Sequence, residues 1–203
     1  MFTGSLVAIV SPMTADGSLD WSAWDRVLDF HLQEGTDAIV IAGTTGESPA
    51  LTEDEIEELS RRAVARCRGR LKLIVGTGTN STAGTVARTR ILSRLGVDGV
   101  MLVTPYYNKP PQEGLYRHFM AAAEAAEVPV ILYNVPGRTV ADMSNETILR
   151  LAQVPGIIGV KDATGNIART ALQRQALGSD FIQLSGEDMT ALAVMAHGGH
   201  GCI

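Results

Sequence analysis

The chain has 203 residues, of which 45% are hydrophobic and 19% charged, so it can bury a substantial core and has the composition of an ordinary globular protein. Its net charge of −5 is scattered along the sequence, which excludes the clustered Lys and Arg of a nucleic-acid-binding surface. Cys67 and Cys202 form no C-x-x-C pair, the N-terminus lacks a secretory pattern, and no apolar run reaches the roughly 20 residues of a membrane span. We therefore expect a cytoplasmic protein with two free thiols.

Short apolar or β-branched runs recur along the whole chain, and each is followed by a longer stretch with the spacing of an amphipathic helix. These runs predict eight strands, over residues 6–10, 38–42, 71–76, 99–103, 129–133, 157–161, 181–184 and 201–203.

Two of the predicted helices also carry end signals. The first covers residues 21–32, and Gly35 supplies a plausible C-terminal stop. The second begins at a capping box in which Thr52 is the cap and Glu55 follows three residues later.

Strands that alternate with helices pair in parallel through right-handed crossovers, either in an open doubly wound sheet or in a closed barrel. An open sheet with a nucleotide site would favour a phosphate-binding glycine loop, but residues 76–81 lack the third glycine of that fingerprint. Eight runs at a repeat near 30 residues, with no linker between them, favour one (β/α)₈ TIM-barrel domain over residues 1–203.

The predicted eighth strand has barely begun at Ile203, whereas a complete barrel has about 250 residues. We therefore expect a barrel truncated within strand eight, without the helix that covers this strand, and unable to close in the ordinary way.

Chemistry in such barrels lies at the C-terminal ends of the strands, where Lys161 follows the buried run 157–160. A lysine there either points into the barrel mouth or pairs with Asp162 in water at the rim. In the mouth, desolvation would lower its pKa and provide the neutral amine that forms a Schiff base with a keto acid. Local sequence leaves both interpretations open.

Other strand ends carry groups that suit the same chemistry. Thr44 and Thr45 offer hydroxyls and amides for a small carboxylate, or else form a tight turn. Tyr133 and Tyr107 can relay protons, or are ordinary buried tyrosines. Arg138 presents a fork for a carboxylate, or is a solvated loop residue.

His197 and His200 form a His-x-x-His pair in a glycine-rich loop, but no carboxylate or cysteine at a suitable spacing completes a metal site. We expect neither a metal nor a cofactor.

Taken together, the segments 43–48, 103–110, 133–139 and 159–165 resemble those of the dihydrodipicolinate synthases, pyruvate-dependent lyases with a TIM-barrel fold. The four motifs fall in the family's order and spacing, and the resemblance spans the whole chain. It implies a lyase that condenses pyruvate with L-aspartate 4-semialdehyde to 4-hydroxy-tetrahydrodipicolinate, in diaminopimelate and lysine biosynthesis.

The resemblance also implies roles for individual residues. Lys161 would form the imine with pyruvate. Thr44, Tyr133 and Tyr107 would form a proton relay, with Tyr107 reaching the neighbouring subunit's site in a dimer or in a tetramer built as a dimer of dimers. The implied substrate-binding residues are Thr45 for the pyruvate carboxylate, Arg138 for the carboxylate of the second substrate, and Gly186 and Ile203 around the lysine.

Two other functions stay open. The chain could be a sibling aldolase of the N-acetylneuraminate lyase or sugar-acid type, which shares the lysine and first tyrosine but, as the resemblance has it, carries other groups at Tyr107 and Arg138. It could also be an inactive truncated barrel fragment.

Lysine-inhibited members of the family bind lysine at the dimer interface, and the resemblance maps Ser48, Asn80 and Tyr106 to this site. Positions 53, 56 and 84 carry Glu, Ile and Gly where sensitive members carry His, His and Glu. We predict weak or absent lysine feedback, because glycine offers no carboxylate for the lysine ammonium.

Overall fold

The computed structural model describes residues 2–203, and its eight strands are hydrogen-bonded in chain order into one closed parallel barrel. The predicted (β/α)₈ architecture is confirmed. The strands are β1 (Gly4–Ala8), β2 (Ala38–Ile41), β3 (Lys72–Gly76), β4 (Gly99–Val103), β5 (Val130–Asn134), β6 (Ile157–Asp162), β7 (Ile182–Ser185) and β8 (Gly201–Cys202).

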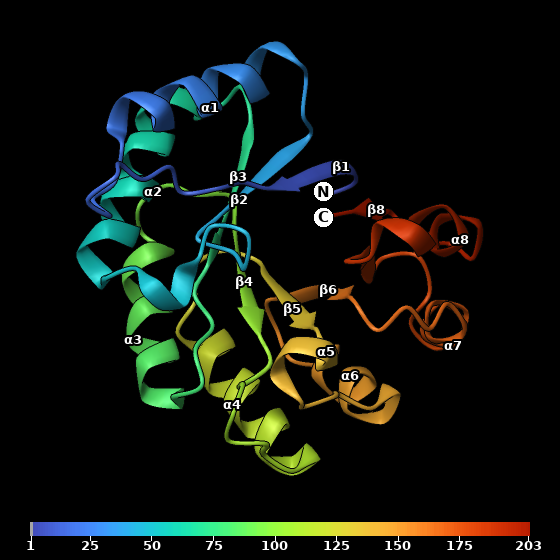
Figure 1. Cartoon of the computed structure of the whole chain (residues 1–203). Coiled ribbons are helices and arrows are strands. Elements are labelled where there is room, and N and C mark those ends of the chain that lie inside the picture. The colour runs from blue at the N-terminus through green and yellow to red at the C-terminus, as the bar shows by residue number, and fades with distance from the viewer. Residues whose placement is uncertain (1) are drawn as a thin grey trace.

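Helices connect successive strands and cover the outside of the barrel, and the two ends of the chain lie side by side at β1 and β8 (Figure 1). In residues 2–203, none of these helices is long and apolar enough to cross a membrane. The helices are α1 (Trp21–Gln33), η1 (Ser48–Ala50), α2 (Glu53–Cys67), α3 (Thr82–Leu92), α4 (Gln112–Glu124), α5 (Pro136–Thr139), α6 (Asn145–Leu151), α7 (Ala168–Leu177), η2 (Asp188–Thr190) and α8 (Ala191–Ala196).

Strands β2 to β7 are largely buried on both faces, as their continuous apolar sequences predict. One face fills the barrel interior, where Leu6, Val40, Ile74, Met101 and Ile131 form a single cluster. The other face packs against the helices in two clusters, one between the early strands and α1–α2 and one between the middle strands and α4–α6.

The predicted helix ends agree with the structure. Helix α1 ends at Gln33 with Glu34 as its C-cap, and Gly35 follows with a φ of +70°. The capping box at the start of α2 is complete, because the Thr52 hydroxyl accepts from the Glu55 amide and the Glu55 carboxylate accepts from the Thr52 amide.

The expectation that the barrel would not close was wrong. Strand β8 has two residues, yet Gly201 and Cys202 pair with β7 on one side and with Gly4 and Ser5 of β1 on the other. The pairing of Gly4 also explains why β1 begins two residues before the predicted run. A side chain at position 201 would prevent this approach, since a Cβ there would lie 2.1 Å from the Gly4 carbonyl oxygen.

We predict that Gly201→Ala lowers the free energy of unfolding by about 1–3 kcal/mol, the usual cost of forcing a methyl group into occupied space. Chemical denaturation of the purified variant measures this change. Gly84→Ala is the control, because position 84 lies in helix α3 with contacts no closer than 3.4 Å, and alanine there favours the helix. Equal stabilities of Gly201→Ala and the parent protein would contradict the role given to this glycine.

Candidate active site

A cavity of about 1010 Å³ opens at the C-terminal ends of the strands, where the fold predicts chemistry. It brings together residues from β1, β5 and β6 and from the loops that follow β2, β5 and β7. Seven of the predicted site residues line it, namely Thr44, Thr45, Tyr133, Arg138, Lys161, Gly186 and Ile203.

Lys161 lies on β6 with its side chain inside the barrel, and only 5% of the residue is exposed. Burial lowers the pKa of its amine to about 8, although the nearby negative charge of Asp188 acts in the opposite direction. The alternative interpretation, a rim ion pair with Asp162, is wrong. Because side chains alternate along β6, the Asp162 side chain points away from the cavity. On that outer face its carboxylate accepts from the Arg169 Nε at 2.9 Å.

Tyr133 is the direct neighbour of Lys161 in the ladder between β5 and β6. The Lys161 Nζ lies 4.3 Å from the centre of the tyrosine ring. Burial raises the pKa of the Tyr133 phenol, while the Thr44 hydroxyl, as a hydrogen-bond partner, and the Arg138 charge act to lower it. The phenol therefore keeps its proton at neutral pH and can pass it between Thr44 and an atom bound near the lysine.

Gly186 gives the lysine chain its space. A Cβ at this position would lie 2.9 Å from the Lys161 Cε and 2.9 Å from the Ala163 Cβ, closer than side-chain carbons approach each other. The lack of a side chain at Gly186 therefore leaves the space that the Lys161 side chain occupies.

Two potential carboxylate-binding groups sit at the mouth of the cavity. Arg138 is exposed on the four-residue helix α5, and Val140 caps this helix with a φ of +58°. Thr45 is exposed in the loop after β2. This loop is bound to the segment that follows β1, because the Ser11 hydroxyl donates to the Gly46 carbonyl at 2.8 Å.

Tyr107 does not join the cavity within this chain. It lies in the loop after β4, is 88% exposed, and adopts a φ of +72° that non-glycine residues rarely take. Its phenol is therefore free to contact a molecule outside the chain.

The three residues mapped to the lysine site lie on neighbouring loops. Ser48 lines a small pocket that also contacts Thr44 and Tyr133. Asn80 and Tyr106 are half-buried in the loops after β3 and β4, which are joined because the Asn108 side chain donates to the Asn80 carbonyl at 2.8 Å.

The His-x-x-His pair contacts backbone atoms. The His197 Nδ1 lies 2.7 Å from the Ala193 carbonyl oxygen, and the His200 Nδ1 accepts from the Gln183 amide at 3.1 Å. Among residues 2–203 no three His, Cys, Asp or Glu side chains are grouped as a metal site would need.

Sequence reasoning missed Asp188, which lines the cavity and acts on the Lys161 pKa. It lies two residues after Gly186, in the loop that follows β7. A carboxylate in the loop after a strand was the signal that could have identified it. The sequence does not show its distance from Lys161, because that distance depends on how the barrel closes.

The model of the dihydrodipicolinate synthetase family matches residues 1–203. The chain is 59% identical to the 4-hydroxy-tetrahydrodipicolinate synthase of Dechloromonas aromatica (strain RCB) and 56% identical to that of Nitrosomonas eutropha (strain DSM 101675 / C91 / Nm57), over all of this chain and 70% of each relative. The chloride-inhibited dihydrodipicolinate synthase from Acinetobacter baumannii, crystallised with pyruvate, matches with a TM-score of 0.97 and 46% identity, over 100% of this chain and 70% of that one.

We predict that Asp188→Asn shifts the reactivity of Lys161 toward lower pH. The amine reacts only when neutral, so its rate rises with pH through the pKa of about 8, and removal of the carboxylate charge lowers that pKa further. Reductive trapping of a keto acid on Lys161, measured from about pH 6 to about pH 10, gives the midpoint. Asp180→Asn, outside the cavity, serves as control. A midpoint that stays in place or moves upward would refute the electrostatic assignment.

Proposed function

This chain belongs to the dihydrodipicolinate synthetase family, and we propose that it condenses pyruvate with L-aspartate 4-semialdehyde to give 4-hydroxy-tetrahydrodipicolinate, a step of diaminopimelate and lysine biosynthesis. The observation that carries the proposal is a buried lysine with a pKa of about 8 that lines the cavity at the end of β6, within the family motif 159–165. It requires neither a metal nor a cofactor.

The first half-reaction makes the pyruvate imine. The neutral Lys161 amine attacks the ketone carbon of pyruvate, and the resulting carbinolamine loses water to form the C=N bond. We assign the proton transfers of this step to Tyr133, which hydrogen-bonds to Thr44. In the proposed relay, Thr44 would pass the proton on to Tyr107 of a second subunit.

The second half-reaction joins the two substrates. Loss of a proton from the methyl carbon turns the imine into an enamine, and this carbon attacks the aldehyde carbon of the second substrate, whose oxygen takes up a proton. The amine of the second substrate then attacks the imine carbon, so that the ring closes and Lys161 is released. One molecule of water leaves for each product formed.

The two carboxylates of the reaction need separate partners. We assign the pyruvate carboxylate to Thr45 and nearby backbone amides, because Thr45 lines the same cavity as Lys161 and its hydroxyl and amide can donate to a small carboxylate. We assign the carboxylate of aspartate semialdehyde to Arg138, whose planar fork can bind both oxygens at the cavity mouth. Gly186 and Ile203 would line the pocket around Lys161.

We also propose a cytoplasmic homo-oligomer. The exposed Tyr107, with its unfavourable backbone angle, fits a dimer in which it completes the partner's site. Met189 and Leu192 are 91% and 81% exposed near α8, and they fit a second, apolar contact that would make a dimer of dimers. Cys67 and Cys202 are both free thiols, which suits a reducing compartment.

The proposal predicts that borohydride reduction with pyruvate attaches a pyruvate-derived group to Lys161, and that the purified protein consumes aspartate semialdehyde with pyruvate. Peptide mass mapping locates the adduct, and Lys161→Arg is the control that keeps a long cationic side chain without a competent amine. Turnover of pyruvate with N-acetylmannosamine in place of aspartate semialdehyde would favour a sibling aldolase. Folded protein without an adduct would favour an inactive fragment.

Weak or absent lysine feedback is a separate prediction. Glu53 is paired with Arg88 at 2.5 Å, so its carboxylate is already neutralised, and position 84 has no side chain to bind an ammonium group. Activity measured against rising lysine concentration tests this directly. Inhibition at low lysine concentration would contradict it.

A further inference from the structure

The outward faces of β5 and β6 carry polar side chains directly behind the catalytic pair. Tyr133 and Asn134 are consecutive on β5, as are Lys161 and Asp162 on β6, and the two pairs are in register. Because side chains alternate along a strand, Tyr133 and Lys161 enter the cavity while Asn134 and Asp162 face the helices. Asn134 and Asp162 therefore connect the strand ends that carry the catalytic pair to the elements packed outside the barrel.

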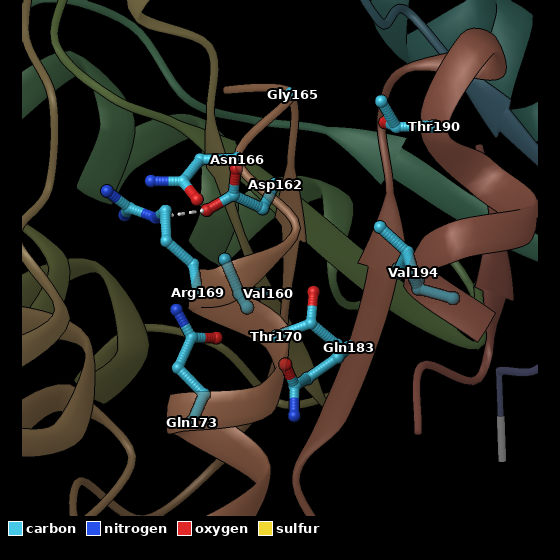
Figure 2. Close-up of a pocket in the computed structure, with 11 residues that line it drawn as sticks. Val160, Asp162, Gly165, Asn166, Arg169, Thr170, Gln173, Gln183, Thr190 and Val194 are labelled. Carbon is cyan, nitrogen blue, oxygen red and sulfur yellow. Dashed lines mark hydrogen bonds and ion pairs between the residues drawn. The ribbon is translucent and has the colours of Figure 1, made fainter. Parts of the chain in front are cut away.

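Arg169, in the first turn of α7, binds Asp162 directly and shares two loop partners with Asn134, and only 11% of its side chain is exposed. Figure 2 shows this side chain extended toward Asp162, whose Oδ2 accepts from the Arg169 Nε at 2.9 Å. The other oxygen of Asp162 accepts from the Thr164 amide at 2.8 Å and from its hydroxyl at 2.5 Å.

The remaining guanidinium nitrogens of Arg169 reach the loop that follows α5. The Nη1 donates to the Asp142 carboxylate at 3.4 Å, and the Nη2 donates to the Met143 carbonyl. Asn134 on β5 also binds this loop, because its side-chain nitrogen donates to Asp142 at 2.7 Å and its side-chain oxygen accepts from the Met143 amide at 3.1 Å.

These hydrogen bonds fix both ends of the segment that carries Arg138. The segment leaves β5 after Asn134, forms α5, and returns to Asn134 and Arg169 at residues 142–143. A single arginine thus joins the end of β6, the start of α7 and the return of this segment. Its fixed fork of donors satisfies three acceptors, which the point charge of a lysine cannot do.

We infer that Arg169 is a positioning residue that holds the Arg138 segment in place against β5 and β6, and that it is required for productive binding of the second substrate. The inference rests on the proposed function for the identity of that substrate. Arg169 itself touches no substrate. It acts through Asp142, Met143 and Asp162.

The test compares Arg169→Gln and Arg169→Lys with the parent protein. We expect the KM for aspartate semialdehyde to rise about tenfold or more in both variants, because small displacements of a binding group weaken substrate positioning strongly. The rate of pyruvate trapping on Lys161 should change by less than about twofold, because Lys161 remains anchored in the barrel ladder. Asp142→Asn should raise the same KM, and the double variant should be no worse than Arg169→Gln alone.

Arg88→Gln is the matched control. The side chain of Arg88 is 10% exposed and makes a bidentate ion pair with Glu53 between α3 and α2, so its loss removes a comparable interaction away from the cavity. Its KM values should stay at those of the parent protein. Equal losses of trapping and turnover in the Arg169 variants, or an unchanged KM for aspartate semialdehyde, would overturn the inference.

Hydrogen exchange provides a readout that does not depend on the reaction. Amides of residues 135–144 should lose protection in Arg169→Gln but keep it in Arg88→Gln. Unchanged protection in this segment would overturn the inference even if the reaction proves to be as proposed. Failure of the parent protein to trap pyruvate would overturn the proposed function alone, because the exchange experiment would still decide whether Arg169 holds the segment.

Discussion

The burial of one primary amine inside the barrel is the constraint on which the rest of the site depends. Lys161 is only 5% exposed, and this burial disfavours the charged amine and lowers its pKa to about 8. The neighbours follow from this placement. Position 186 is a glycine because the Lys161 side chain passes within 2.9 Å of where a Cβ would stand, and the charge of Asp188 offsets part of the effect of burial on the lysine pKa. Tyr133 packs its ring against the amine and keeps its own proton.

Because a barrel strand is buried on both faces, each strand end carries two functions at once. The inward residues Tyr133 and Lys161 face the cavity, and the next residue on each strand faces outward. Asp162 binds Arg169, and Asn134 binds Asp142 in the loop after α5. The polar contacts on the outer face thus hold the segment that carries Arg138 against the strands whose inner face carries the lysine. This requires the closed ladder, since an open edge would leave the strand ends free to shift.

The sequence predicted the features that depend on local pattern. Eight apolar runs, the capping box at Thr52 and the position of Lys161 at the end of a buried strand can all be recognised within a few residues. Closure through two residues of β8 could not, because it depends on the backbone of Gly201 meeting that of Gly4 across the whole chain. The same holds for the charge of Asp188 at the lysine and for the contacts of Arg169 with residues 142–143, which pair positions that are distant in sequence but adjacent around the barrel.

The pKa of about 8 leaves Lys161 mostly charged at neutral pH, and this is consistent with a nucleophile. Removing its proton at pH 7 costs about 1.4 kcal/mol, against about 5 kcal/mol for a lysine in water, since each pKa unit corresponds to about 1.4 kcal/mol. The charged state is meanwhile stabilised by the Tyr133 ring at 4.3 Å and by Asp188. Deeper burial would make the neutral amine still easier to reach but would remove the interactions that hold the resting lysine in place. A buried amine beside a phenol and a carboxylate therefore combines a stabilised charged resting state with a small free-energy cost of reaching the neutral, reactive one.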